Sequence, residues 1–319
     1  MRAVSMLFLT CFMLLPGTAL SAHASGKIWP LRQVSMVLPS AAGNEDGSFY
    51  AAFAGYFSAH AKVDMTLRAI PGRSGADAWS IMDGAENDDG HTITAVSFPN
   101  LTLLGRKMDS GVNRNSMQVC AVSSYIPAAL WAPRNSPFTG LEDFIALARK
   151  APGKLLVAGN GSCTAGHIAW AAFDRQAGIR TIYLPHMGSL EAGNAVNRNL
   201  AAAFWADAAA LPALKEHFRP LAVASEKRSP AFPDVPTFAE LGYAVTAGTF
   251  RGIALPKTSD SGARETITGI FAATQNTPSF REEATALGFT LTDIRDAALD
   301  AFLGELETRC IVEAEDYGL

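Results

Sequence analysis

The sequence predicts an α/β protein with two lobes. Short apolar runs with the character of buried strands alternate with amphipathic, helix-like stretches along the whole chain. This alternation is typical of parallel sheets that are covered by helices on both faces. The chain of 319 residues is long for one hydrophobic core and comfortable for two lobes. Its composition, 49% hydrophobic and 18% charged, argues against disorder because enough apolar surface is available for burial.

The first 24 residues have the character of a secretory signal peptide. Arg2 gives a positive start, residues 4–15 are apolar, and Ala22 and Ala24 are small residues at the spacing that a signal peptidase reads. The apolar run is too short for a membrane span, although an N-terminal anchor is the alternative. We therefore expect an exported, periplasmic protein that begins near Ser25.

Strands and helices follow each other in order along the rest of the chain. Aromatic residues at helical spacing in the stretch 49–60 predict a helix that packs on a sheet. Further helices are expected near Trp79, at 141–148, after Thr164, after Ser189, at 263–275 and at 297–314. Apolar runs predict strands at 34–39, 92–96, 128–132, 155–158, 181–184, 202–205, 221–224 and 253–255.

Loops rich in glycine, serine and asparagine connect several of these strands to the helices that follow. They cover residues 40–48, 71–75, 159–164 and 186–189. In parallel sheets, ligands bind beyond the carboxyl ends of the strands, where such loops enter helices. Small residues let backbone N–H groups approach a ligand, and helix starts favour anions. These loops are therefore the predicted ligand-binding region.

Composition and motifs argue against several other functions. The formal net charge is -4 and no basic cluster is present, which argues against a nucleic-acid partner. The sequence has no G-x-S-x-G elbow, no G-x-G-x-x-G run and no P-loop lysine. The histidines lack metal-ligand spacing, so we expect neither a metal nor a cofactor.

Two short residue pairs were considered as catalytic candidates. Cys163 and His167 are four positions apart across a helix start, where they need not face each other. Glu45 and Asp46 are adjacent in one loop, which is no obvious acid/base pair, and Asp46 is well placed as a helix N-cap. We therefore expect no catalytic residues and no enzyme activity.

Cysteine usage indicates a fold that does not depend on disulfides. Cys11 lies in the predicted signal peptide, which leaves Cys120, Cys163 and Cys310 after export. An odd number of thiols permits at most one disulfide. Whether Cys120 pairs with Cys310 stays open.

Several motifs together resemble one family, the periplasmic receptors of tripartite tricarboxylate transporters, also called Bug-type receptors. The most specific stretch is 221–237, Leu-Ala-Val-Ala-Ser-Glu-Lys-Arg-Ser-Pro-Ala-Phe-Pro-Asp-Val-Pro-Thr, followed by Glu240 and Gly242. Other matches are the loop 42–46, the turn 71–75, the run Asp-Gly-His-Thr at 89–92 that leads to Ser97, and the segment 152–155 that leads to Gly161 and His167. The resemblance covers nearly all of the expected mature chain.

The resemblance implies a type II periplasmic-binding-protein fold, in which two α/β lobes close about a hinge on a ligand in the cleft between them. We expect lobe 1 to comprise 25–122 and 248–319, and lobe 2 to comprise 123–247. The implied ligand is a small mono-, di- or tricarboxylate, an amide or an amino acid. The implied partners are the membrane subunits of the transporter, with the receptor itself a monomer. A ligand-sensing receptor and a secreted hydrolase are the alternative functions.

Family analogy also implies the ligand-binding residues. Asp46, Ser74, Gly75, Ser97, Ser162 and Thr164 stand at or beside cleft-lining positions, and each has a structural alternative as a cap, turn or loop residue. Asp207 is the nearest aspartate to a position where relatives that bind amino acids meet the ammonium group. The predicted ligand-binding set is Gly43, Asn44, Asp46, Ser74, Gly75, Ser97, Gly161, Ser162, Thr164 and Asp207.

This sequence departs from the family pattern in the first loop. Asn44 and Glu45 replace small residues there, and His186 replaces a common tyrosine in a later loop. Glu45 and Asp46 bring two negative charges against one nearby cation, Arg73. Unless Glu45 points outward, a strongly anionic ligand such as citrate would meet an unfavourable field. We therefore expect a less charged ligand, such as a monocarboxylate, an amino acid or an amide.

Overall fold

The computed structural model describes residues 29–83, 89–107, 112–209 and 211–319. The predicted signal peptide lies outside these residues. The strands are β1 Val34–Leu38, β2 Met65–Ala69, β3 Thr92–Phe98, β4 Met117–Pro133, β5 Leu156–Gly159, β6 Ile182–Pro185, β7 Ala203–Asp207, β8 Phe218–Val223, β9 Gly248–Pro256 and β10 Thr290–Arg295.

Ten α-helices are described, several of which begin directly after a strand-end loop. They are α1 Glu45–Ala61, α2 Ala76–Ser80, α3 Asn100–Lys107, α4 Leu141–Lys150, α5 Ala165–Ala177, α6 Ser189–Asn197, α7 Pro212–His217, α8 Ser261–Gln275, α9 Pro278–Ala286 and α10 Ala297–Asp316. Short 3-10 turns include η1 Arg73–Gly75.

Two strands, β4 and β9, connect the two halves of the molecule. The ten-stranded sheet has the order β2-β1-β3-β9-β4-β7-β5-β6, and β8 and β10 also pair with β4. Residues 117–127 of β4 pair with β9, whereas residues 128–133 pair with β7 and β8. One continuous strand thus belongs to the first half over its early residues and to the second half over its late ones.

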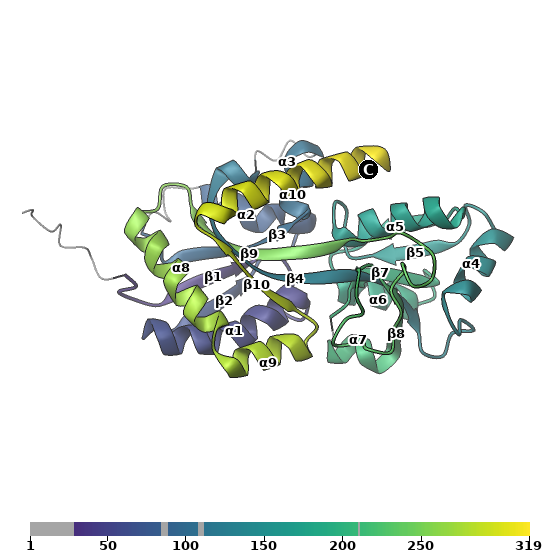
Figure 1. The fold of residues 1–319 in the computed structure, drawn as a ribbon, viewed down its shortest axis with the longest axis horizontal. Helices are drawn as coiled ribbons and strands as arrows, with labels where there is room; N and C mark the ends of the chain where they lie inside the picture. The colour runs from purple at the N-terminus through teal and green to yellow at the C-terminus, as the bar shows by residue number, and fades with distance from the viewer. Residues whose placement is uncertain (1–28, 84–88, 108–111, 210) are drawn as a thin grey trace, which may run out of the picture.

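Figure 1 shows the two halves as two lobes joined by β4 and β9. Lobe 1 contains β1, β2 and β3 with α1, α2, α3, α8 and α9, and lobe 2 contains β5, β6, β7 and β8 with α4, α5, α6 and α7. The fold is therefore the two-lobed α/β fold that the sequence predicts.

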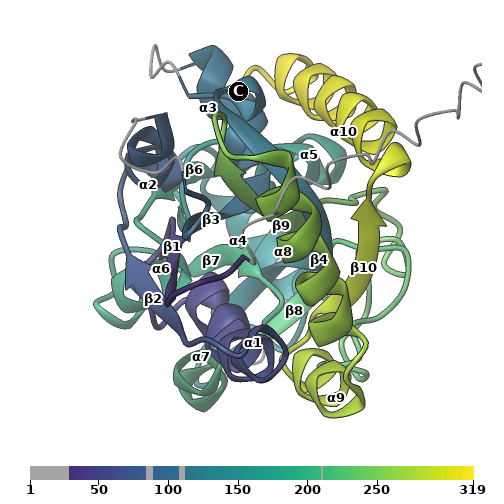
Figure 2. The ribbon, with the colours of Figure 1, turned by 90° about the vertical axis from the view of Figure 1, so that its left-hand side faces the viewer.

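Helices cover both faces of the sheet in lobe 1. Figure 2 shows α2, α3 and α10 on one side of β1 and β3, and α1 and α9 on the other. The aromatic residues Phe49, Phe53 and Phe57 of α1 are fully buried, and the ring of Phe53 lies 4.6 Å from that of Phe271 and 5.7 Å from that of Phe280. The aromatic stripe is core, as predicted, and it packs on helices α8 and α9 as well as on the sheet because one apolar cluster includes all of them.

The prediction of parallel sheets holds for β1 to β3 and for β5 to β7, but not for β4 and β9. Strand β1 is parallel to β2 and β3, and β5 is parallel to β6 and β7, but every pairing of β4 and β9 is antiparallel. A chain that leaves one lobe and returns must run in both directions between the lobes. The predicted strands 128–132 and 253–255 were therefore the apolar parts of much longer strands.

Apolar patterning missed two strands, and the N-cap of helix α1 was assigned to the wrong residue. Strands β2 and β10 are largely exposed or half-buried at the edges of the sheet, so they carry no continuous apolar run. The prediction of Asp46 as an N-cap was also wrong. Asn44 is the N-cap of α1, and Asp46 lies in its first turn.

The three cysteines of the described residues lie in the interior of the protein. Cys120, Cys163 and Cys310 are buried, and Cys120 and Cys310 do not form a disulfide with each other in this structure. Burial raises the pKa of the Cys120 and Cys310 thiols to about 12.

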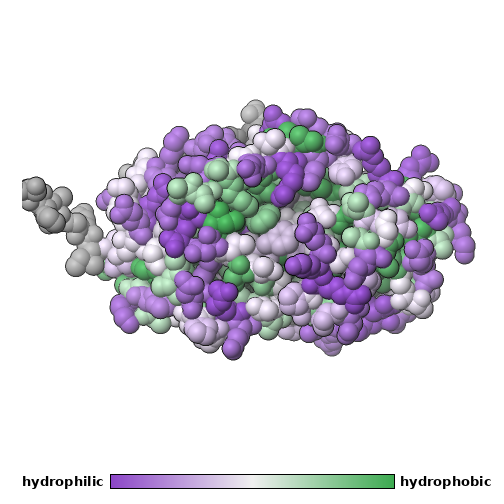
Figure 3. Space-filling view, viewed as in Figure 1, coloured by the Kyte–Doolittle hydropathy of each residue, from purple (hydrophilic) through white to green (hydrophobic). Residues whose placement is uncertain are grey.

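Within the described residues, no helix combines the length and apolar character needed to cross a bilayer. Hydrophilic residues cover most of the face in Figure 3, where apolar patches are small and interrupted.

Candidate ligand-binding cleft

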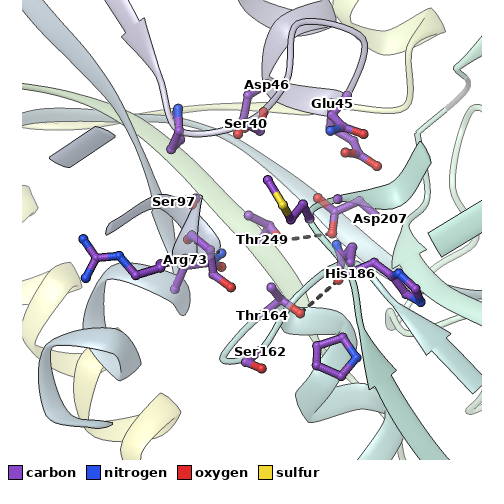
Figure 4. Close-up of a pocket in the computed structure, with 18 of the residues that line it drawn as sticks. Ser40, Glu45, Asp46, Arg73, Ser97, Ser162, Thr164, His186, Asp207 and Thr249 are labelled. Carbon is purple, nitrogen blue, oxygen red and sulfur yellow. Dashed lines mark hydrogen bonds between the residues drawn. The ribbon is translucent and has the colours of Figure 1, made fainter. Parts of the chain in front are cut away.

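A cavity of about 240 Å³ lies where loops of the two lobes face each other (Figure 4). The strand-end loops that the sequence singles out supply most of its walls. The lining residues are Pro39, Ser40, Asn44, Glu45, Asp46, Gly72, Arg73, Ser74, Ser97, Asn100, Asn160, Ser162, Thr164, Pro185, His186, Met187, Gly188, Asp207, Thr249 and Arg251.

The loop between β1 and α1 forms one wall of lobe 1 and touches lobe 2. The side-chain oxygen Oδ1 of Asn44 accepts a hydrogen bond of 3.1 Å from the backbone N–H of Leu190, at the start of α6. Gly188 precedes α6 with φ 136°, and a Cβ atom there would lie only 2.4 Å from Nδ2 of Asn44. The two lobes are thus in close contact at this edge of the cleft.

The turn around η1 forms the second wall of lobe 1. Arg73 and Ser74 have positive φ angles of 41° and 54°, and Gly75 follows with φ 111°. The side chain of Asn100 donates a 3.3 Å hydrogen bond to the carbonyl of Ser74. Arg73, the cation that the sequence suggested for the cleft, is about half exposed and pairs with Asp77 at 2.5 Å, so it is largely neutralised.

The loop between β5 and α5 forms a wall of lobe 2. Thr164 is the N-cap of α5, and its hydroxyl accepts a 3.2 Å hydrogen bond from the backbone N–H of His167. The Tyr183 hydroxyl donates a 2.8 Å hydrogen bond to the carbonyl of Gly161 and holds the loop from the side of β6. Because α5 begins at the cavity, the partial positive charge of its first turn favours an anionic group there.

A buried ion triad closes the hinge side of the cavity. The guanidinium of Arg251, on β9, is 2.6 Å from the carboxylate of Asp46 on α1 and 2.6 Å from that of Asp207 on β7. Thr249 donates a further hydrogen bond of 3.0 Å to Asp207. Burial acts to lower the pKa of Arg251, but the carboxylates of Asp46 and Asp207 outweigh it and raise that pKa. Arg251 is therefore a permanent cation that connects both lobes.

Glu45 points into the cavity rather than outward. Its side chain extends from the start of α1 toward Asp207 (Figure 4), and the residue is 5% exposed. Oxygen Oε1 is buried without a hydrogen-bond partner among the described residues. Burial and then the charge of Asp207 raise the pKa of Glu45 to about 7. Burial also raises the pKa of Asp207, although Arg251 opposes this.

Most of the residues predicted to bind ligand line this cavity. They are Asn44, Asp46, Ser74, Ser97, Ser162, Thr164 and Asp207. Gly43, Gly75 and Gly161 are not among the lining residues, because each supports a neighbouring wall. A Cβ at Gly75 would collide with the ring of Trp79, and one at Gly161 would lie 2.9 Å from the Ser74 hydroxyl across the cleft.

Sequence reasoning missed Arg251, Thr249, Asn100 and Asn160. Arg251 carried a usable signal, since it is the single charged residue in the strand Gly-Thr-Phe-Arg-Gly-Ile-Ala-Leu-Pro. A charge in an otherwise buried strand needs a partner. Its partners come from Asp46 and Asp207, at separations of 205 and 44 residues, which no local pattern reveals.

Residues 77–310 match the model of the tripartite tricarboxylate transporter family receptor. The chain belongs to this family. Receptors of the family are periplasmic substrate-binding proteins.

Two curated relatives of this receptor are similar over most of their length. It is 25% identical to the UPF0065 protein in the gbd 5' region of Cupriavidus necator, over 83% of this chain and 81% of the relative. It is also 25% identical to Protein BugT of Bordetella pertussis, over 76% of each chain.

Solved structures have the same fold. The periplasmic binding protein BugD superposes with a TM-score of 0.83 at 20% identity, covering 91% of this receptor and 99% of BugD. A Rhodopseudomonas palustris protein solved with adipate has a TM-score of 0.83 at 21% identity, covering 91% and 98%. MatC from Rhodopseudomonas palustris, with bound malate, has a TM-score of 0.78 at 20% identity, covering 91% and 99%.

Proposed function

We propose that this receptor captures a small carboxylate-bearing molecule between its lobes and delivers it to the membrane subunits of a tripartite transporter. The observation that carries the proposal is the cavity itself. It lies between two lobes, helix α5 begins at its edge, and hydroxyl, amide and guanidinium groups line it. Such groups bind carboxylates through charge-assisted hydrogen bonds and through helix N-termini.

The volume of the cavity supports a small ligand. At about 240 Å³ it lies below the range of roughly 300–1,000 Å³ that is usual for drug-sized ligands. Two structures of the same fold hold the small acids adipate and malate. The proposed binding residues are those predicted residues that line the cavity, together with Asn100, Asn160 and Arg251.

We also propose that binding is not followed by chemistry. Among the described residues, no group of three or more histidine, cysteine or acidic side chains could hold a metal ion. Nδ1 of His167 lies 3.4 Å from the backbone N–H of Cys163, which favours a structural role for this histidine.

Domain boundaries, export and oligomeric state complete the proposal. Lobe 1 would comprise 25–122 and 248–319, and lobe 2 would comprise 123–247. The chain would be exported through the signal peptide 1–24 and act as a monomer. On the face drawn in Figure 3 the apolar patches are interrupted, so this face offers no large continuous apolar area of the kind that stable interfaces bury.

Calorimetry with a panel of small mono- and dicarboxylates, their amides and amino acids tests ligand capture. We expect saturable binding of at least one carboxylate and a raised melting temperature, since a ligand that binds only the folded state stabilises it. Uptake of the same compound should fall when either this receptor or the membrane subunits are deleted. Absence of binding across the panel would contradict ligand capture, and unchanged uptake would contradict the transport role.

A further inference from the structure

Two ends of the cavity differ in chemistry. Glu45, Asp46 and Asp207 form an acidic end, and Ser97 and Ser162 contribute hydroxyls farther from it (Figure 4). We refer to the second group as the hydroxyl end. A ligand that spans the cavity therefore meets three carboxyl groups and the Arg251 guanidinium at one of its ends and hydroxyl groups at the other.

Carboxylates outnumber cations around Glu45. The charged groups that act on Glu45 directly are Asp207 on β7 and Arg251 on β9. Asp46, Arg73 and His186 also line the cavity. The Arg251 guanidinium is shared by two aspartates and Arg73 is paired with Asp77, so neither cation is reserved for Glu45.

Glu45 is also the acidic group at this end that lacks a strong partner. Both aspartates hold salt bridges of 2.6 Å, whereas Oε1 of Glu45 is buried with no hydrogen-bond partner among the described residues. A buried carboxyl oxygen without a partner is costly unless a ligand supplies a donor or the group takes up a proton.

We propose that Glu45 determines the ligand class of this receptor: it selects a monocarboxylate that carries a hydrogen-bond donor, such as an ammonium or amide group, and disfavours dicarboxylates. The inference rests on the proposed function, because it assumes that the cavity binds a carboxylate. The carboxylate of the ligand faces the hydroxyl end, and the donor group faces Oε1 of Glu45. A second ligand carboxylate at the acidic end would add a charge beside three acidic side chains, of which only the two aspartates are paired with Arg251.

Protonation of Glu45 makes this selection dependent on pH. Burial and Asp207 raise the pKa of Glu45 to about 7, so a dicarboxylate meets a neutral carboxyl group in mild acid and a negative one in mild alkali. Dicarboxylate affinity should therefore fall as the pH rises through neutrality. The affinity of an ammonium-bearing ligand should rise over the same range.

Isothermal titration calorimetry with matched ligands tests the inference at about pH 6 and about pH 8, on either side of this pKa. The probes are succinate, glutarate and adipate, the half-amide of each, the ω-amino acids of matching chain length, and the α-amino acids alanine and glutamine. In the wild type at the higher pH, we expect the tightest ligand to be a half-amide or an amino acid. It should bind at least about tenfold more tightly than the matching dicarboxylate.

Glu45→Gln should raise the affinity for dicarboxylates about tenfold at the higher pH and remove its pH dependence. Glu216→Gln is the matched control, because it removes the same charge from a side chain of α7 that is 73% exposed. It should leave the ligand preference unchanged.

The possible results separate this inference from the function on which it rests. Wild-type protein that prefers dicarboxylates at both pH values would overturn the role of Glu45 and leave carboxylate capture intact. The same holds if Glu45→Gln and Glu216→Gln have the same ligand preference. A panel in which no compound binds would instead overturn the proposed function itself.

Discussion

Asp46 and Asp207 lie on opposite lobes and share one guanidinium, that of Arg251, at 2.6 Å from each. Asp46 is in the first turn of α1, Asp207 ends β7, and Arg251 is on the crossing strand β9. The side chains of Asp207 and Arg251 are at most 5% exposed, and that of Asp46 is 10% exposed. Because the three charges come from both lobes and the strand between them, the triad links folding stability to the geometry of the cleft.

Replacement of the triad cation should destabilise the protein strongly. Arg251→Met leaves two buried carboxylates uncompensated, and breaking a buried ion pair in this way costs about 3–5 kcal/mol. Urea unfolding followed by circular dichroism measures the change. The loss should be smaller at about pH 5 than at about pH 7.5, because Asp207, whose pKa is raised by burial, can then take up a proton.

A combined variant shows whether charge causes that loss. Asp46→Asn and Asp207→Asn together with Arg251→Met remove all three charges, so we expect stability to recover by a large part of the difference. A triple variant no more stable than Arg251→Met at either pH would show that packing of the arginine stem, rather than charge balance, stabilises the hinge.

Glu45 should make the stability of the unliganded protein fall as the pH rises. Burial raises its pKa from 4.5 to about 7, so between these values the folded protein holds a proton that the unfolded chain has lost. The stabilisation is complete below about pH 4.5 and is lost as the pH passes about 7, by up to about 3 kcal/mol. Urea unfolding at a series of pH values should show this slope in the wild type.

Glu45→Gln should flatten that part of the pH profile, whereas the surface variant Glu216→Gln should keep it. A wild-type profile that runs parallel to that of Glu45→Gln between about pH 4.5 and pH 7 would mean that Glu45 has an ordinary pKa.

Closure of the lobes should depend on the absence of a side chain at Gly188. A Cβ atom there would lie 2.4 Å from Nδ2 and 2.9 Å from Cγ of Asn44, whose side chain is held by the backbone of Leu190. Gly188→Ala should therefore hold the lobes apart and weaken ligand binding by about tenfold or more, as misplacement of about 1 Å does at other sites. Calorimetry and small-angle scattering with ligand measure affinity and closure.

Gly178→Ala provides the control for backbone strain. Gly178 also has a positive φ, 59°, but a Cβ atom there meets no other atom within 4 Å. Both variants should lose stability, Gly178→Ala about 1 kcal/mol and Gly188→Ala more, because the φ 136° and ψ 178° of Gly188 lie in a region that is almost restricted to glycine. Only Gly188→Ala should lose affinity, and an equal loss in both variants would assign the effect to strain.

The thiols of Cys120 and Cys310 should be protected from reagents in the folded protein. Cys120, Cys163 and Cys310 are buried, and high pKa values keep the Cys120 and Cys310 thiols in the unreactive protonated form. The mature chain should therefore react slowly with a thiol reagent when folded and at three positions when unfolded. A single reactive thiol in the unfolded, unreduced protein would indicate a disulfide instead.

Local sequence patterns predicted the elements whose burial is regular. The apolar run at β1 and the aromatic stripe of α1 predicted a core strand and a core helix, and both are buried as expected. The edge strands β2 and β10 were not predicted, because half-exposed strands have no continuous apolar run. The resemblance to the receptor family supplied what periodicity could not, namely that two such sets of elements form two lobes.

The sequence by itself determined the α/β class and the loops that line the cleft, because strand–helix alternation and small residues at strand ends are local signals. Only the tertiary structure decided the charge of that cleft. Arg251 is brought to Asp46 and Asp207 from 205 and 44 residues away by a strand that runs between the lobes. Glu45 acquires its raised pKa only when folding buries it facing Asp207. Such contacts depend on how distant segments pack, and no local pattern contains that information.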